Sequence, residues 1–285
     1  MRISGELKII IGAALFAFIP VGVVLGKDLS VYSLLFGRLL VATIFLLFFQ
    51  KNIRQIFKLN AITFFKLLSW SMLMLLAMIT YFLSIGYSNM GVASALLGTQ
   101  PLFIVLLAGL FLREKISGLT IAATALTLAG IACITGIDQL KSPTFLLGQT
   151  LAICSALLLA LNFILQKKYL SQFNGKQLVF YQSLAQLPLL IPFLFFETGT
   201  VTLNATYAVL LLGIVCTVIS YSLIYNGINQ VNAQKIGVLQ SIEYVIPVFI
   251  GMFFFNEKPD VWMFVGMILI IVACLLISLQ KNSLH

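Results

Sequence analysis

The stretch VLQSIEYVIPVFIGMFFFNEK at residues 238–258 places a carboxylate, Glu243, inside a long apolar run. A shift of 143 residues carries the stretch ALLGTQPLFIVLLAGLFLREK, at 95–115, onto it. The shift places Gln100 on Glu243, and it places the Glu-Lys pair that closes one stretch on the Glu-Lys pair that closes the other. Few letters are identical, but the layout is the same. The two stretches therefore predict an internal repeat, with one copy in each half of the chain.

The overall composition is that of a membrane protein. Apolar residues make up 61% of the 285 residues and charged residues only 9%, whereas an ordinary soluble domain is about half apolar and about a quarter charged. A soluble protein of this size could not cover its surface with so few charges. A lipid-facing exterior needs none. A membrane-spanning helix takes about 20 apolar residues, because the bilayer core is about 30 Å thick and a helix rises about 1.5 Å per residue.

Polar residues, glycines and prolines divide the chain into apolar runs of about that length. The predicted spans are 7–26, 31–50, 64–86, 91–112, 118–137, 147–166, 177–196, 206–228, 235–255 and 261–280. The connections are short and leave no room for a soluble domain. The first run lacks a small-residue cleavage site and is followed directly by Lys27 and Asp28, so it is read as an uncleaved span. The predicted fold class is an all-α integral membrane protein with ten transmembrane helices.

The span count combines with the repeat to give the architecture. The expected halves are residues 1–140 and 141–285, each with five spans. Because five is odd, the second copy enters the membrane from the face opposite to the first. The sequence therefore predicts two inverted five-helix repeats, the layout of many secondary transporters, which bind their solutes near the midplane between the repeats.

The distribution of basic residues predicts the orientation. Of the 17 lysines and arginines, thirteen lie in or beside the loops on the N-terminal side, three lie on the other side, and Arg38 lies within a span. Cytoplasmic loops are enriched in these residues. Both termini are therefore expected in the cytoplasm of a multi-pass plasma-membrane protein, specifically of a bacterial inner membrane. The net charge of +9 is explained by this bias, and no nucleic-acid partner is expected.

Three stretches resemble the drug/metabolite transporter superfamily, specifically its EamA-type members with ten transmembrane helices. They are FGRLLVA at 36–42, YFLSIGYSNMGVASALLGTQPLF at 81–103 and LQSIEYVIPVFIGMFFFNEK at 239–258. The family's Glu/Pro step reads Gln-Pro in the first half and Glu-Tyr in the second, with the proline moved to Pro247. The resemblance implies transport of small solutes such as amino acids and other metabolites, often outward.

Glu243 and Arg38 are the two charged residues expected near the membrane interior. Each lies about eight or nine residues into its span, and a charge at the bilayer centre is costly, so both side chains should face protein or water. Glu243 is expected either to hold a substrate amine or a transported proton, or to bond neighbouring helices. Arg38 is expected either to bind a carboxylate or phosphate, or to act in structure or gating. In the second case it would extend toward the outer surface, or its partner would be Asp28, Glu243 or a backbone carbonyl.

Polar and aromatic residues complete the candidate site. Several amides and tyrosines lie four residues apart on one helix face, and such faces either line a wet cavity or tie helices together. Two residues of the first half and two aromatic residues beside the Glu/Pro steps are added to these. The candidate substrate-binding or cavity-lining residues are Arg38, Tyr81, Gln100, Phe103, Asn162, Gln166, Gln182, Tyr221, Tyr225, Glu243 and Tyr244. Glu114 is expected at a helix end.

The expected function is secondary transport, in the direction of export, of a small polar metabolite by alternating access. One cation and one anion inside the membrane favour an amino acid or related zwitterion, and the alternative is a nucleoside-like or S-adenosylmethionine-like metabolite held by aromatic stacking. A channel is the alternative of a different class. An enzyme is not expected, since the spans contain no histidine and the chain has neither GxSxG nor HExxH.

No cofactor is expected. The four cysteines lie in apolar runs without CxxC pairing, the one histidine is His285, and no P-loop GxxxxGK[ST] occurs. The driving force is then proton coupling, exchange of solutes or the solute's own gradient. The partners expected are the solute and the lipid bilayer, and the protein is expected to be a monomer or a homodimer.

Overall fold

The computed structural model describes residues 4–49, 60–88, 90–135, 143–195, 199–246, 249 and 261–279. Every regular element in these ranges is helical, which confirms the all-α prediction. Helix lies within each of the ten predicted spans. In the described residues, six helices or runs of adjoining helices are long and apolar enough to cross a membrane by length and composition, and the other apolar helices reported there are shorter.

The first half contains seven helices in the described residues. They are α1 (Gly5–Phe16), α2 (Ile19–Leu25), α3 (Val31–Phe49), α5 (Ala61–Tyr87), α6 (Met90–Leu97), α7 (Gln100–Leu112) and α8 (Gly118–Thr135). In the second half the described elements are α9 (Pro143–Tyr169), α10 (Gly175–Leu194), α11 (Leu203–Leu210), the π-helix η1 (Leu211–Tyr221), α12 (Ser222–Ile228), α13 (Ala233–Gln240) and α15 (Val261–Ser278). Residues 242–246 are also helical.

Polar caps start several of these helices before the predicted spans begin. Ser4 accepts a hydrogen bond from the Leu7 amide at 3.3 Å, and Asn60 accepts one from the Thr63 amide at 2.8 Å. Asn174 starts α10 with a capping box. Such side chains satisfy amides that have no partner within the helix. Because the spans were predicted from apolar length, they omitted these polar first turns.

Two predicted spans are broken at equivalent places. The fourth span is interrupted at Gly98-Thr99, between α6 and α7, and the ninth is interrupted at Ser241, after α13. Gly98 and Ser241 are 143 residues apart. Gln100 and Glu243 therefore each lie two residues beyond a break, which confirms that their alignment in the sequence reflects equivalent positions in the structure.

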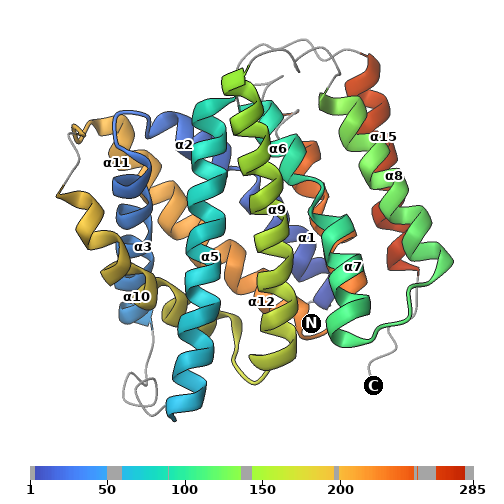
Figure 1. The fold of residues 1–285 in the computed structure, drawn as a ribbon, viewed down its shortest axis with the longest axis horizontal. Coiled ribbons are helices and arrows are strands. Elements are labelled where there is room, and N and C mark those ends of the chain that lie inside the picture. The colour runs from blue at the N-terminus through green and yellow to red at the C-terminus, as the bar shows by residue number, and fades with distance from the viewer. Residues whose placement is uncertain are drawn as a thin grey trace.

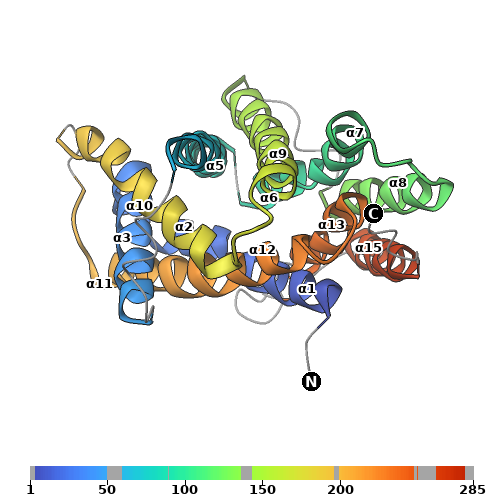
Figure 2. The same ribbon diagram turned by 90° about the horizontal axis from the view of Figure 1, so that it is seen from below.

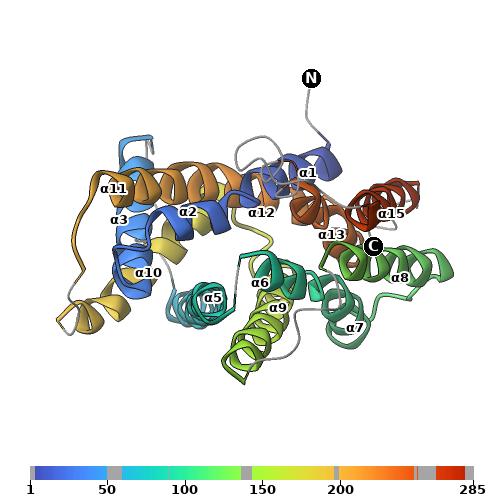
Figure 3. The ribbon, with the colours of Figure 1, turned by 90° about the horizontal axis from the view of Figure 1, so that it is seen from above.

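The halves pack with exchanged partners. At one end of the molecule α8 lies beside α15, and at the other α3 lies beside α10, with α5 and α9 between them (Figures 1 and 2). Seen from above, α2 lies beside α11 and near α6 (Figure 3). The contact of α5 with α9 has a counterpart in the contact of α1 with η1 and α12. Contacts that repeat when the halves are interchanged are those of a two-fold arrangement.

Individual hydrogen bonds repeat in the same way. Ser155 of α9 donates to the carbonyl oxygen of Ala77 in α5 at 2.7 Å, and Ser220 of η1 donates to the carbonyl oxygen of Gly12 in α1 at 2.8 Å. The 143-residue shift carries Gly12 to Ser155 and Ala77 to Ser220. The register read from the sequence is therefore the register in which the two halves pack.

Glycines at equivalent positions allow close helix contact. A Cβ atom added to Gly5 would lie 3.2 Å from a Val231 methyl group, and one added to Gly148 would lie 2.8 Å from the Ser88 Cβ. The same shift relates Gly5 to Gly148 and Ser88 to Val231. Small residues at helix interfaces are the usual means of tight packing in membranes.

Candidate functional site

A small cavity lies where elements of both halves meet. Phe16 and Pro20 come from the broken first span, Tyr81 from α5, Ser94 from α6, and Glu243 and Tyr244 from the segment after α13. Its free volume is about 10 Å³, which is about that of one water molecule. The cavity brings together three predicted site residues, Tyr81, Glu243 and Tyr244. A metabolite fits there only if helices move apart.

The break in the ninth span positions Glu243. The chain leaves α13 at Gln240, turns at Ser241 and resumes as helix at 242, so the carboxylate follows directly on a helix start. The Glu243 side chain is 5% exposed. Next to it the Tyr244 side chain, 6% exposed, lies within reach of the Glu243 carboxylate and lines the same cavity.

Ser94 is a cavity residue that the sequence did not predict. Its hydroxyl lies 3.1 Å from the Tyr81 hydroxyl, within hydrogen-bond distance. The two residues are thirteen apart and are brought together by the turn between α5 and α6. A helical period within one span could not have indicated this contact. The available signal was indirect: Ser94 stands five residues before the break that precedes Gln100.

Arg38 lies in a separate buried position. Its side chain is 1% exposed, its Nη1 donates to the Met78 sulfur at 3.5 Å, and its guanidinium lies 5.8 Å from the centre of the Phe82 ring. Its Nε has no hydrogen-bond partner among the described residues. The ion pairs among the described residues are Glu6–Lys235 and Glu114–Lys167, and neither includes Arg38. The alternatives that paired Arg38 with Asp28 or Glu243 are therefore not what the structure contains.

A column of aromatic rings connects the Glu243 cavity to the Arg38 region. The ring of Phe16, in the cavity wall, lies 5.4 Å from that of Tyr221, and Tyr221 lies 5.3 Å from Tyr225. The Tyr221 hydroxyl also donates to the Met78 sulfur, at 3.8 Å, and Arg38 donates to the same sulfur. The column ends at Trp70, whose ring is 5.3 Å from Tyr225.

Tyr225 and Gln182, both predicted site residues, are bonded to one another. The Tyr225 hydroxyl donates to the Gln182 Oε1 at 2.6 Å, which connects α12 to α10. Gln182 is 1% exposed and Tyr225 is fully buried. The pair lies beside the aromatic column, so it supports the column from the α10 side.

Asn162 and Gln166 tie helices together. Asn162 Nδ2 donates to the Trp70 carbonyl oxygen at 3.0 Å, and Trp70 Nε1 donates to the Asn162 carbonyl oxygen at the same distance. Gln166 Nε2 donates to the Tyr225 carbonyl oxygen at 3.3 Å. The sequence left two roles open for these amides, lining a cavity or connecting helices. The structure places both in contacts between helices and not in the wall of the small cavity.

Gln100 and Phe103 lie outside the cavity wall as well. Gln100 opens α7, is 2% exposed, and its Nε2 has no hydrogen-bond partner among the described residues. Phe103 is partly buried and packs against the hydrophobic core. Gln100 thus offers an unpaired buried donor at the position equivalent to Glu243, whereas Phe103 belongs to the packing of α7.

Charged side chains connect the helices on the face of the molecule that carries the N-terminus. Glu114 accepts hydrogen bonds from the amides of Ala233 and Gln234 at 3.1 and 3.4 Å, and it pairs with Lys167 at 3.5 Å. Lys167 also donates to the Val231 carbonyl oxygen. Glu114 lies at two helix ends, as its own amide donates to the Ala108 carbonyl oxygen at the C-terminal end of α7 while its carboxylate accepts from the first amides of α13. Glu257, its counterpart, lies outside the described residues.

A second buried pair stands on the same face. Lys235 Nζ donates to Glu6 Oε1 at 2.8 Å, and the lysine side chain is 1% exposed. Thr120 donates to Gln234 Oε1 at 2.9 Å and so adds α8 to the same network. On the opposite face Thr202 donates to the Asp28 carboxylate at 2.8 Å. These contacts join residues of the first half to residues of the second at both faces.

Comparison with known proteins gives a consistent result. The sequence profile of the EamA-like transporter family matches residues 3–136 and again 146–279, and the two matches begin 143 residues apart. An uncharacterized transporter of Archaeoglobus fulgidus is 27% identical, over 97% of this chain and 96% of its own length. An uncharacterized transporter of Bacillus subtilis, YxxF, is 23% identical, over 90% and 84% respectively. One solved crystal structure has the same fold, with a TM-score of 0.81, 15% identity and 96% of each chain covered.

Proposed function

The chain belongs to the EamA-like transporter family, and on that premise we propose that it is a secondary transporter that exports a small zwitterionic metabolite, such as an amino acid, by alternating access. In this proposal the halves, residues 1–140 and 141–285, are inverted repeats that rock against one another. The solute binds between them and is exposed to the two sides of the membrane in turn.

The observation that carries the proposal is the pair of buried charges. Glu243 and Arg38 are both buried, and neither is neutralised by the other. Burying an unpaired charge in a membrane is expensive. A solute with an ammonium group and a carboxylate would compensate both charges, the first at Glu243 and the second at Arg38. The bridging residues Phe16, Tyr221 and Met78 would then line the solute between its charged ends.

The small volume of the cavity supports the proposed movement of the two halves. A volume of about 10 Å³ excludes any metabolite, so binding requires the halves to separate on one face. The contacts of Glu114 and Lys235 close the face that carries the N-terminus. Opening that face would break them, and closing it would re-form them. These contacts are therefore the proposed gate, and the proposed coupling is to a proton held by Glu243 or to a counter-transported solute.

The experiment compares metabolites released by cells that express the protein with those released by cells that express Glu243→Gln or Arg38→Ala at matched membrane levels. Lys115→Ala is the control, because that side chain is exposed and outside the network. We expect one class of zwitterion to accumulate with the intact protein and with the control, and not with either site variant. Release that is unchanged in both site variants would refute the assignment of the charges to the solute.

The aromatic column supports a second candidate, a nucleoside-like or S-adenosylmethionine-like solute. Phe16, Tyr221 and Tyr225 form successive ring contacts beside the cavity, and a flat base could stack between such rings once they separate. Under this alternative Tyr221→Leu abolishes release more completely than Glu243→Gln does. Under the zwitterion proposal the order is reversed.

The proposed orientation has both termini in the cytoplasm of a bacterial inner membrane. Its support is the excess of lysine and arginine on the N-terminal side. Reporter fusions at the C-terminus test it, since a phosphatase that needs the periplasm should be inactive there and a fluorescent protein should be bright. Whether the transporter works as a monomer or a homodimer is read from its mass in nanodiscs.

A further inference from the structure

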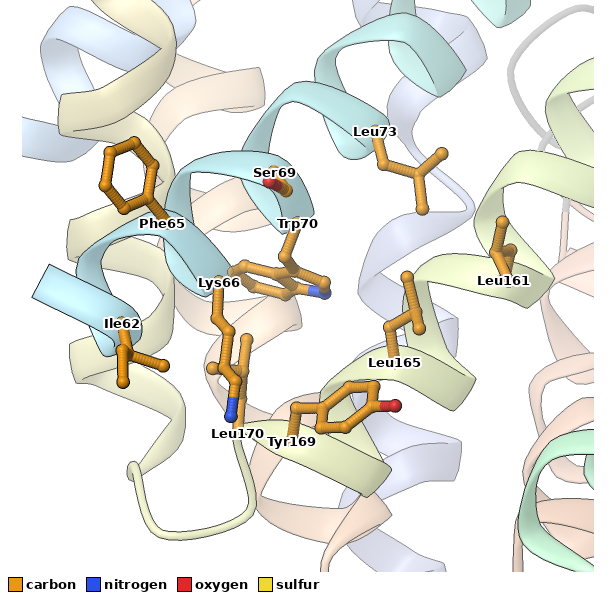
Figure 4. Close-up of a pocket in the computed structure, with 10 residues that line it drawn as sticks. All are labelled: Ile62, Phe65, Lys66, Ser69, Trp70, Leu73, Leu161, Leu165, Tyr169 and Leu170. Carbon is orange, nitrogen blue, oxygen red and sulfur yellow. The ribbon is translucent and has the colours of Figure 1, made fainter.

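A groove of about 610 Å³ opens between α5 and α9, away from the cavity that holds Glu243 (Figure 4). That volume is in the range of about 300–1,000 Å³ that small-molecule sites occupy. Phe65, Leu73, Leu161 and Leu165 give it apolar walls, and Trp70 lies at its base. The groove therefore suits a flexible hydrocarbon and not a polar solute.

The groove faces the surroundings of the protein and not its interior. Phe65 and Ile62, on its α5 side, are 63% and 69% exposed, whereas Trp70 beneath them is 1% exposed. In a membrane-spanning protein, exposed apolar side chains of this kind contact lipid tails. A lipid chain can therefore enter the groove from the side, without passing through the protein.

The end of the groove is positively charged. Figure 4 shows the Lys66 side chain extended toward Tyr169 and Leu170. The ammonium groups of Lys66 and Lys168 lie 5.3 and 5.4 Å from the centre of the Tyr169 ring. Neither belongs to the ion pairs found among the described residues, which use Lys167 and Lys235. Two cations thus share one aromatic ring at the polar end of an apolar groove.

The charges at this end of the groove come from α5 and from the C-terminal end of α9, where Lys66 and Lys168 lie. A basic pocket between membrane helices on the cytoplasmic side is the arrangement that recognises anionic lipid headgroups. Zwitterionic lipids offer the same hydrocarbon, but their headgroups have no net charge to complement these cations.

We propose that this groove binds one anionic phospholipid. One acyl chain lies between α5 and α9, against Trp70 and Leu165, and the headgroup phosphate is held by Lys66 and Lys168. The Ser69 hydroxyl lies among the lining residues and adds a polar group to the groove wall beside Trp70. The lipid fills the space that the two helices leave open and so fixes their separation at this end of the molecule.

Trp70 supplies a direct probe, because the chain has only two tryptophans. Trp262 is 64% exposed and lies in α15, and Trp262→Phe leaves Trp70 as the single emitter. The full-length protein is placed in bilayers of phosphatidylcholine mixed with brominated phosphatidylglycerol, or with brominated phosphatidylcholine as the zwitterionic comparison. Bromine on an acyl chain quenches tryptophan fluorescence on contact, so quenching reports occupancy of the groove.

We expect the relative binding constant of the brominated phosphatidylglycerol to exceed that of the phosphatidylcholine by about 25-fold, from about fivefold for each of the two lysines. In Lys66→Gln/Lys168→Gln the preference should disappear. The matched double variant Lys8→Gln/Lys176→Gln, with the same loss of charge outside the groove, should retain it. Ser69→Phe, which keeps both cations but fills the groove, should abolish the quenching by both lipids.

Three results would overturn the proposal. Equal quenching by both lipids in the intact protein would mean that the cations do not select the headgroup. An unchanged preference in the groove-lysine variant would place the anion elsewhere. Displacement of the phosphatidylglycerol by millimolar inorganic phosphate would identify a site for free phosphate and not for a lipid. None of these measurements depends on transport, so the lipid site stands or falls separately from the transported solute.

Discussion

The Ser220 hydroxyl donates to the carbonyl oxygen of Gly12 at 2.8 Å, across an interface where a Cβ on residue 12 would lie 2.9 Å from the Ser220 carbonyl oxygen. The hydrogen bond thus depends on the absence of a side chain at its acceptor. It connects the first helix of one half to the π-helix of the other, at the border of the Glu243 cavity. Its counterpart joins Ser155 to Ala77.

Gly12→Val should destabilise the protein. The added Cβ would lie 2.6 Å from Ile224 as well as close to the Ser220 backbone, and overpacking of this kind typically costs about 1–3 kcal/mol. Thermal unfolding of the purified protein measures the effect. Gly86→Ala is the matched control, because a Cβ at Gly86 meets no atom within 4 Å. A control variant that unfolds as early as Gly12→Val would contradict the steric explanation.

Ser155→Ala and Ser220→Ala should each lower stability by a similar amount, about 0.6 kcal/mol and not more than about 1.7 kcal/mol, as is typical of hydrogen bonds between membrane helices. The two bonds occupy equivalent places in the two halves and have nearly equal lengths. The double variant should show the sum of the two effects, since the sites share no partner. Unequal losses would mean that the equivalence in position does not extend to energy.

Tyr225→Phe should lower stability more than the double variant Tyr225→Phe/Gln182→Leu does. The single change leaves the buried Gln182 Oε1 without the donor that it now has at 2.6 Å, and an unsatisfied buried group costs about 1–3 kcal/mol. Removing both polar groups avoids that loss. Unfolding in a series of denaturant concentrations gives the free energies of the intact protein, of Tyr225→Phe, of Gln182→Leu and of the double variant. A double variant whose loss equals the sum of the two single losses would show that the hydrogen bond contributes nothing.

Glu114→Gln should loosen the face that carries the N-terminus. The carboxylate holds two α13 amides and Lys167, and hydrogen bonds to charged groups contribute about 1.5–3 kcal/mol each. Cys274 reports on this movement, because its thiol donates to the Val238 carbonyl oxygen in α13 at 3.1 Å and is buried. With the other three cysteines replaced by alanine, we expect alkylation of Cys274 by a membrane-permeant reagent to quicken at least about tenfold in the variant.

Lys115→Gln is the control for that measurement, since Lys115 is the exposed neighbour of Glu114. Its side chain takes no part in the contacts of the carboxylate. An equal acceleration in both variants would show that a general change of charge, and not the loss of the Glu114 contacts, exposes Cys274.

Apolar length predicted the helices because a helix must be long and apolar to cross lipid. The 143-residue shift predicted which positions of the two halves are equivalent. Lipid requires long apolar helices, and the 143-residue shift placed Gln100 and Glu243 beyond equivalent breaks. The helix ends were placed less well, because caps such as Asn60 are polar and lie outside the apolar runs. The split of the first span before Pro20 was visible only as a proline, which often bends a helix without breaking it.

The candidate site was predicted in part. Tyr81, Glu243 and Tyr244 meet at one cavity. Each was predicted because it is a polar or aromatic residue near a helix break or near the membrane midplane. Ser94 and Met78 escaped prediction, since a short hydroxyl and a thioether carry no signal of their own within an apolar run. Asn162 also could not be assigned in advance, because the same helical spacing serves cavity walls and helix contacts.

The unbroken α9 and the broken α1–α2 occupy equivalent places, and so do the continuous α5 and the π-helical η1. Under the proposed alternating access, interchanging the halves turns each conformation into a counterpart that opens to the opposite side. Were the halves identical, the two counterparts would have the same free energy and would be equally populated. The departures from symmetry make the two free energies differ, so the proposed resting preference for one side of the membrane originates in the residues that differ between the halves.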